Sequence, residues 1–421
     1  MRLREANRDQ VVPVPAYLDA LIDDRHLARL IWRVVERLDL SACAEGLVVV
    51  EGGPGRSAAD PQILVGLWLY ATSQGVTSAR ALERLCVAHV AYIWLCGGIS
   101  MNYHTLSDFR TAHGEALTAI MTEVLGHLRA AGLIRFEHVA QDGVRVRASA
   151  GAASFRRQPT LEQGLSQARA FVEKVARGEG EHEALSRGER AAQHRAAREQ
   201  VDRLEAALAQ MPSARAAKKR GEEAKARVST TDPEARVMKM PDGGFRPAYN
   251  IQLAADTAHQ VIVGVDVTNE GSDMGQAPGM VEQVEQRTGE LPAQWLMDGG
   301  FAKKASIEAV EAKGPEVVAP VQVPKDPDRD PHEPTAKDSA TIAAWRVRMA
   351  SDAAKQTYKL RASTIECVNA KARAHHGLQQ VRVRGVAKVL CVALWMAIAH
   401  NILILVRTGA THAPVQPAAT S

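Results

Sequence analysis

The sequence predicts an α/β protein: a mixed sheet flanked by helices, with an all-helical N-terminal domain and an inserted helical hairpin. Three observations lead to this prediction. Up to about residue 133, apolar residues recur at threes and fours, as they do in helices. From residue 135, five segments rich in β-forming residues alternate with Gly, Pro and Asn turns. Between the first two of these, residues 158–227 are rich in Ala, Glu, Arg and Gln and show a heptad-like spacing.

Length and composition set broad limits. A chain of 421 residues exceeds the usual size of one domain, so we expect two or three units. Lys and Arg number 52 against 48 acidic residues, and the net charge of +4 allows a polyanionic partner without requiring one. The five cysteines stand singly, with no CxxC pair for zinc, which indicates reduced thiols in the cytoplasm. The N-terminus has no apolar signal-peptide core, so we do not expect secretion.

The N-terminal domain, residues 1–133, is expected to be helical. We expect one helix to begin at Asp60 and to end at Gly75, and Ser78 to cap the next helix. A third helix is expected to start at Thr105. Such a helix-turn-helix-like run often presents one helix to a DNA groove, although ordinary helical bundles share the pattern. The side chains there that could meet phosphates or base edges are Arg80, Arg84, His104 and Arg110.

The second domain, residues 134–407, is expected to hold the sheet. Its strands are predicted within residues 135–148, 249–256, 260–268, 294–300 and 316–321. Helices are predicted at residues 276–287 and 303–313, and again after the fifth strand. Strands and helices in this order are typical of a mixed sheet with helices packed on it.

Three further segments have a composition of their own. Residues 158–227 read as two coiled-coil-like helices that cover each other's apolar seam, and we interpret this hairpin as a solvated spacer. Residues 324–339, rich in Pro and Asp, are expected to be a mobile loop, and residues 408–421 a flexible tail. Residues 386–406 are apolar and long enough to span a bilayer. Because a lysine, a histidine and an asparagine interrupt this last segment, we expect a buried core helix instead.

Three acidic residues stand in positions that require explanation. Asp142 lies amid β-forming residues in the first strand, where burying a carboxylate is costly unless a cation pairs with it. Asp298 ends the fourth strand and is followed by two glycines, which leave room for a large ligand. Glu366 opens a helix on which Arg373, seven residues on, shares its face. Carboxylates from separate elements are what two Mg²⁺ ions need for phosphodiester chemistry.

Other acids leave this choice open. Surface or turn roles are the default for any single acidic residue in an α/β protein, where acids at strand ends are common. Four more acids also lie near predicted strands: Asp232, Asp256, Asp266 and Asp273.

Several sequence blocks carry a family resemblance that runs from about residue 61 to residue 405. The N-terminal blocks are GLWLYATSQGVTSARALERLC and YHTLSDFRTAHG. The later blocks are DGVRVRASAG, TDPEARVMKMPDGGFRPAYNIQLAAD, LMDGGF and YKLRASTIECVNAKARAHHG. The chain resembles bacterial insertion-sequence transposases of the DDE type with an InsH-like N-terminal domain. The resemblance implies an RNase H-like catalytic core in residues 134–407, two Mg²⁺ ions with Mn²⁺ as a substitute, and DNA as the partner.

The resemblance also implies residue roles. It places the catalytic, metal-binding carboxylates on Asp142, Asp298 and Glu366, separated by 156 and 68 residues by subtraction of their numbers. Tyr358 and Arg361 match residues that help to hold terminal DNA in related transposases.

The chain departs from the family pattern beside the last carboxylate. Arg373 stands where the family usually has a lysine. After Glu366 the family generally reads Pro-Val-Phe-Gly, whereas this chain reads Cys367-Val368-Asn369-Ala370. An aromatic residue and a glycine are therefore lost beside the expected active site.

The resemblance implies a cut-and-paste DNA transposase. It would bind terminal inverted repeats, cleave the DNA and join the ends to target DNA, as a homodimer on DNA in the bacterial cytoplasm, associated with the nucleoid. The alternative is a sequence-specific DNA-binding protein, derived from a transposase, that has lost catalysis. A scaffold built on the coiled hairpin, without DNA, is a third reading, but it leaves the strand-end acids unexplained.

Overall fold

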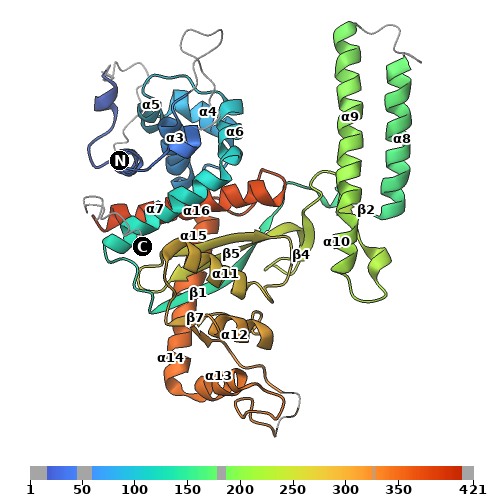
Figure 1. Cartoon of the computed structure of the whole chain (residues 1–421). Helices are drawn as coiled ribbons and strands as arrows, with labels where there is room; N and C mark the ends of the chain where they lie inside the picture. The colour runs from blue at the N-terminus through green and yellow to red at the C-terminus, as the bar shows by residue number, and fades with distance from the viewer. Residues whose placement is uncertain (1–16, 45–58, 178–185, 325, 327, 410–421) are drawn as a thin grey trace, which may run out of the picture.

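The computed structural model describes residues 17–44, 59–177, 186–324, 326 and 328–409. In Figure 1 a helical N-terminal part lies over one side of a mixed sheet, and a long helical hairpin projects beside it. The described residues confirm the predicted α/β fold, with helices on the sheet, an all-helical N-terminal part and a helical insertion. The expected tail, residues 408–421, lies outside the described residues after residue 409.

The N-terminal part consists of helices, most of which begin at a capping side chain. A 3-10 turn, Leu18–Leu21, precedes α1 (Leu27–Val35), α2 (Ser41–Ala44), α3 (Pro61–Ser73), α4 (Ala79–Ala88), α5 (Val90–Cys96), α6 (Tyr103–Ala112) and α7 (Gly114–Ala130). Asp60 and Ser78 cap α3 and α4, as predicted. The third start is two residues earlier than predicted, because the Asn102 side chain accepts a hydrogen bond from the Thr105 backbone N–H at 2.9 Å.

The sheet has six strands, five of which were predicted. They are β1 (His138–Arg147), β4 (Arg236–Lys239), β5 (Phe245–Asp256), β6 (Ile262–Thr268), β7 (Gln294–Leu296) and β8 (Glu316–Val318). The central strand β1 is antiparallel to β5 and parallel to β7, which in turn is parallel to β8. The far edge of β5 pairs with both β6 and β4. The order β6-β5-β1-β7-β8, antiparallel on one side of β1 and parallel on the other, is the RNase H-like arrangement.

Helices pack against this sheet. They are α11 (Ala277–Thr288), α12 (Lys304–Glu311), α13 (Ala340–Ala350), α14 (Asp352–Arg361), α15 (Cys367–Ala374) and α16 (Val386–Arg407). A π-helical turn, Ala362–Glu366, joins α14 to α15, so that the two helices form one helical path (Figure 1). Residues 319–339, except for 325 and 327, are described without helix or strand, in agreement with the predicted loop.

The apolar helix α16 is buried inside the protein. It packs on α3, α6 and α7 on one side and on β6 on the other, and 83% of its most apolar window is buried. Its polar residues have backbone partners: the Asn401 amide accepts from the Ile262 N–H at 2.9 Å and donates to the Ile262 carbonyl at 2.8 Å. The prediction of a core helix is therefore confirmed. One continuous apolar core joins the N-terminal helices, α16 and the sheet, so α16 stabilises both parts.

The insertion is a helical hairpin with a small core of its own. It comprises α8 (Gln158–Arg177), α9 (Arg187–Ala209) and α10 (Met211–Ala216), and a two-stranded ribbon of β2 (Phe155–Arg156) and β3 (Val228–Ser229) holds its base. Apolar residues of both long helices, among them Leu161 and Leu204, form that core. Residues 178–185 between the helices lie outside the described residues.

The buried histidine of α16 makes stability depend on pH. His400 is 4% exposed, and its Nε2 lies 2.9 Å from the Gln260 carbonyl. Burial, more than any nearby charge, lowers its pKa from 6.5 to about 4. His400 therefore takes up a proton below about pH 6.5 in the unfolded chain, but only below about pH 4 in the folded chain.

We predict that the free energy of unfolding falls as the pH is lowered through this window, by up to about 1.4 kcal/mol per pH unit from this residue. In His400→Gln, which keeps a donor for the Gln260 carbonyl, the fall should be shallower. Urea unfolding of both proteins at several pH values measures this. Equal pH dependence in the two proteins would exclude His400 as the cause.

Candidate active site

The three acids predicted from the sequence lie on three separate elements. Asp142 is in the middle of β1, the central strand, and Asp298 follows β7, its parallel neighbour. Glu366 is the last residue of the π-helical turn between α14 and α15. A strand, a strand end and a helix therefore each present one carboxylate.

One guanidinium brings these carboxylates together. Arg361 Nη2 lies 3.1 Å from Asp142 Oδ1 and 3.9 Å from Asp298 Oδ2. Its Nη1 donates to Glu366 Oε1 at 3.2 Å. The Arg361 side chain is 9% exposed, so its positive charge is largely shielded from water. This charge balances part of the repulsion among the three acids.

The π-helical turn puts Glu366 on the same side as Arg361. In an α-helix, with 3.6 residues per turn, residues five apart point well away from each other. The wider π turn brings them onto one face, and buried Thr364 and Ile365 fix that turn against the core. Glu366 was predicted to open a helix, whereas the structure places it inside a continuous helical run.

Asp142 is held in an environment that disfavours its charge. Burial is the largest cause that raises its pKa to about 6, and the negative charges of Asp298 and Asp273 act in the same direction. The Arg361 charge and the Gly143 backbone N–H oppose that rise. The Asn369 side chain donates to Asp142 Oδ2 at 2.9 Å. The carboxylate of Asp142 therefore has a donor on each oxygen.

Asn369 is the residue that sequence reasoning noticed but did not place in the site. It is 8% exposed, and its Oδ1 is buried with no hydrogen-bond partner among the described residues. Its position, three residues after Glu366, is one where the chain departs from the resembled family. That departure was the only sequence signal, and it gave no indication of a contact with Asp142.

The other acids near strands have local structural roles. Asp256 accepts the backbone N–H groups of Phe136 and Ala258, both at 2.9 Å. Asp232 accepts the Tyr249 hydroxyl at 2.6 Å, and Asp266 accepts the N–H of Val267.

Asp273 is also held by neighbouring side chains. Its Oδ1 accepts from the Asn250 and Gln252 side-chain amides, both at 2.7 Å. A Cβ on Gly143 would lie 2.0 Å from that same oxygen, which explains the glycine beside Asp142.

The donor chemistry of the site fits hard divalent ions. Carboxylate oxygens are preferred ligands of Mg²⁺, and the unpartnered Asn369 Oδ1 adds an amide oxygen. In the described part of the chain, no group of three acids, histidines or cysteines stands close enough to hold an ion as arranged. Arg361 stands between the acids, so its guanidinium has to move away before an ion is held there.

Two more predicted residues lie on the same helical run. Tyr358, one turn before Arg361, is half-buried, and burial raises its pKa, with the charges of Asp298 and Glu366 acting the same way. Arg373 lies on α15 beside a cavity of about 280 Å³ that Arg145, Arg147 and Arg246 also line. The structure records no ion pair between Arg373 and the three carboxylates in the described part of the chain.

The candidate DNA-binding side chains of the N-terminal part fall into two groups. Arg80, Arg84 and His104 are exposed on α4 and α6, where the Arg80 guanidinium lies 4.8 Å from the centre of the Tyr103 ring. Arg110 is 7% exposed, lies over the Trp68 ring and donates to the Thr77 carbonyl at 2.5 Å. Burial lowers its pKa to about 10. Arg110 therefore lies inside the core, out of reach of a DNA backbone.

Comparison with known families gives two matches. A family model described as "Transposase domain (DUF772)" matches residues 16–112, and one described as "Transposase DDE domain" matches residues 329–406. Neither a curated protein nor a solved structure matches the chain. Tyr358, Arg361 and Glu366 lie within the second match, whereas Asp142 and Asp298 lie outside both.

Arg361 and divalent ions should compete for the same three acids. We predict that Arg361→Gln, which leaves the acids without a cation, lowers stability in EDTA by about 1–3 kcal/mol, a modest loss because two of the three acids, Asp298 and Glu366, are 39% and 58% exposed. Mg²⁺ should then raise the melting temperature of the variant more than that of the unchanged protein. Arg373→Gln, on the same helical run but away from the acids, serves as the control and should respond as the unchanged protein does. An equal Mg²⁺ response in all three proteins would contradict this competition.

Proposed function

We propose, from the premise that the chain belongs to the DDE transposases of insertion sequences, that it cleaves the ends of a mobile element and joins them to target DNA. The observation that carries this proposal is the meeting of Asp142, Asp298 and Glu366 at one guanidinium. Three separate elements converge there, on the central strands of an RNase H-like sheet. Both steps are displacements at phosphorus, so one site can perform them in turn.

The three carboxylates are proposed to hold two Mg²⁺ ions, or Mn²⁺ in their place. When bound, such ions activate the attacking oxygen and stabilise the leaving oxyanion. Asn369 keeps the Asp142 carboxylate oriented by donating to Oδ2, which leaves Oδ1 directed at the centre of the site. Arg361, once released from the acids, remains within reach of a phosphate that lies there. Its planar donor pair matches two phosphate oxygens.

DNA is the partner of the proposed reaction. Terminal inverted repeats and target DNA are both double-stranded, and we propose a homodimer that holds two ends, in the bacterial cytoplasm. Tyr358, Arg361 and Arg373 are proposed contacts of the catalytic part, residues 134–407. Arg80, Arg84 and His104, all exposed, are the proposed contacts of the N-terminal part, residues 1–133. Because α16 shares a core with both parts, the full chain is the sensible material for experiments.

The alternative function, a DNA-binding protein without catalysis, arose from the stretch Cys367-Val368-Asn369-Ala370. Two contacts in that stretch favour an intact site. Val368 is fully buried in the core, and Asn369 donates to Asp142. At position 369, where the family pattern has an aromatic packing residue, this chain thus has an asparagine that makes a hydrogen bond to Asp142.

The acids can be tested one at a time. Asp142→Ala, Asp298→Ala and Glu366→Ala should each abolish Mg²⁺-dependent nicking of a substrate with the element's ends, while DNA binding stays nearly unchanged, because a lost ligand misplaces the ions and leaves the fold intact. Asp266→Asn, an acid on β6, which β5 separates from β1, is the control and should nick normally. Near-normal nicking by any alanine variant would remove that residue from the site. If the wild-type protein binds DNA but never nicks it, that result would support the non-catalytic alternative. If the wild-type protein binds no DNA, that result would support the scaffold hypothesis.

Substitutions of Asn369 distinguish its contribution to catalysis from its contribution to packing. Asn369→Leu keeps the volume and loses the amide, so Asp142 loses its fixed orientation. We expect nicking to slow by about 10- to 100-fold, with unchanged DNA affinity, and a higher Mg²⁺ concentration should recover part of the rate. Asn369→Gln, which keeps the amide, should lose less. Equal rates for Asn369→Leu and the unchanged protein would show that the hydrogen bond to Asp142 does not matter for the reaction.

A further inference from the structure

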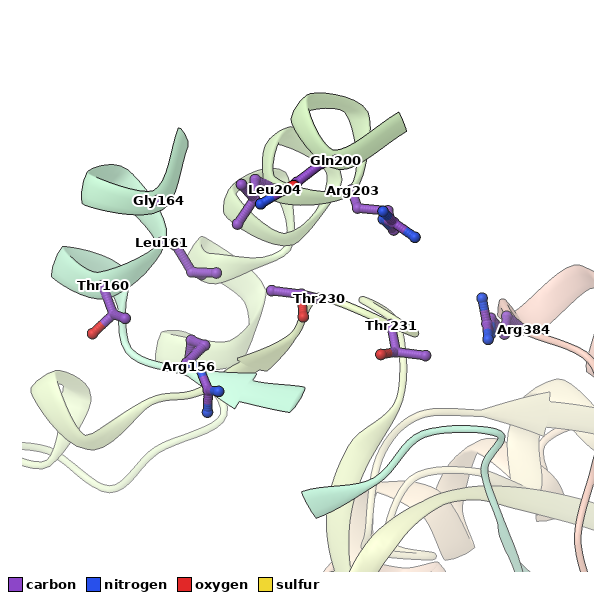
Figure 2. A pocket seen from close by; sticks show the side chains of 10 residues that line it. All are labelled: Arg156, Thr160, Leu161, Gly164, Gln200, Arg203, Leu204, Thr230, Thr231 and Arg384. Atoms are coloured by element: carbon purple, nitrogen blue, oxygen red, sulfur yellow. The ribbon is translucent and has the colours of Figure 1, made fainter. Parts of the chain in front are cut away.

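A polar pocket of about 500 Å³ lies where the helical hairpin meets the rest of the chain (Figure 2). Its walls come from elements far apart in the sequence: β2 and the first turns of α8, the second half of α9, the segment after β3, and a residue two positions before the start of α16. The lining residues are Arg156, Thr160, Leu161, Gly164, Gln200, Arg203, Leu204, Thr230, Thr231 and Arg384. In Figure 2, Arg203 lies on the hairpin and Arg384 on the chain segment across from it, and Thr231 follows Thr230 from the base of the hairpin toward Arg384.

The charged side chains that line this pocket are all positive. Three arginines and three threonine hydroxyls line it, and no carboxylate is among its described lining residues. Arg156 makes a long hydrogen bond, 3.4 Å, to the Phe155 carbonyl. Neither Arg203 nor Arg384 has a recorded ion pair in the described part of the chain. The described lining of the pocket therefore offers donors and positive charge without a carboxylate, which is the chemistry of an anion site.

The backbone directly after Arg384 is held by residues of the TDPEAR and YNIQ blocks, which the proposed active site does not use. The backbone N–H of Gly385 donates to Asp232 Oδ1 and to the Tyr249 hydroxyl, both at 3.2 Å. The N–H of Val386 donates to the Glu234 carboxylate. Gly385 has a φ of +87°, a conformation that favours glycine. These contacts hold the Arg384 backbone next to Thr231, which precedes Asp232.

We propose that this pocket binds the sugar-phosphate backbone of duplex DNA, and that the hairpin is one wall of a DNA-binding groove and not only a spacer. The inference rests on the proposed function, since it names a further contact of the same DNA partner. Arginine and hydroxyl donors at such a site bind phosphodiester oxygens irrespective of base sequence. Because the walls belong to both the hairpin and the sheet side, bound DNA would also fix the hairpin relative to the catalytic part.

The test is DNA binding by the full-length protein as a function of salt, in EDTA so that no strand is cut. The probe is a fluorescent duplex of about 40 base pairs of random sequence, since a phosphate contact needs no terminal repeat. The variants are Arg203→Gln, Arg384→Gln and the double variant. Arg198→Gln is the matched control: it is exposed on the same helix, five residues away and hence on another face, and it does not line the pocket. Thermal melts of all variants report on folding.

A phosphate contact predicts a change in the salt dependence. The slope of log K against log salt should become shallower by about 1 for each arginine removed, with affinity at moderate salt falling several-fold. The Arg198→Gln control should keep the slope of the unchanged protein. Arg203→Lys with Arg384→Lys should also keep it, because the charges remain. A lysine variant that loses as much slope as the glutamine variant would overturn the phosphate contact.

Failure of this inference is distinct from failure of the proposed function. If the unchanged protein binds duplex DNA and the double glutamine variant, still folded, binds it with the same slope, the pocket does not hold DNA and the proposed transposase function is untouched. If the unchanged protein binds no duplex even at low salt, the proposed function itself fails and the pocket inference fails with it.

Discussion

The ion pairs of Arg361 with three acids are the interaction on which the candidate site depends. Three carboxylates brought together in a partly buried place repel one another, and each loses hydration. Without a cation they would take up protons or move apart. Arg361 supplies that cation from within the chain, at 3.1 Å from Asp142 and 3.2 Å from Glu366. The folded protein can thus keep the three carboxylates close together while no divalent ion is bound.

The remaining architecture can be understood as the support of this cluster. The RNase H-like sheet places Asp142 in its central strand and the end of β7 beside it. The π-helical turn rotates Glu366 onto the face of Arg361, and α15 then carries Asn369 back to Asp142. The long helix α16 packs on β6 and on α3, α6 and α7, and it joins the N-terminal helices to the sheet through one core. A movement of the N-terminal helices would therefore reach the site through α16, which is densely packed.

The sequence was most informative where a residue's neighbours in the chain decide its structure. Strand periodicity predicted five strands of the sheet, and the caps Asp60 and Ser78 predicted two helix starts. Features that depend on distant partners were not predicted. The π turn has no periodic signal, and the short strand β4 forms only because β5 lies beside it. Arg110 looked like a surface arginine because nothing local shows that Trp68 and Thr77 enclose it. The placement of Arg361 among all three acids needed the folded chain.

The most direct measurement of the central claim is site-specific cleavage of the protein by bound Fe²⁺ in ascorbate and peroxide, with the cut peptides identified by mass spectrometry. Fe²⁺ in place of Mg²⁺ generates radicals that cut only the adjacent backbone. If Asp142, Asp298 and Glu366 hold ions together, cuts appear near all three positions, excess Mg²⁺ suppresses them together, and Asp142→Ala abolishes them. Cuts confined to other segments, or cuts near the three acids that excess Mg²⁺ leaves unchanged, would contradict the account.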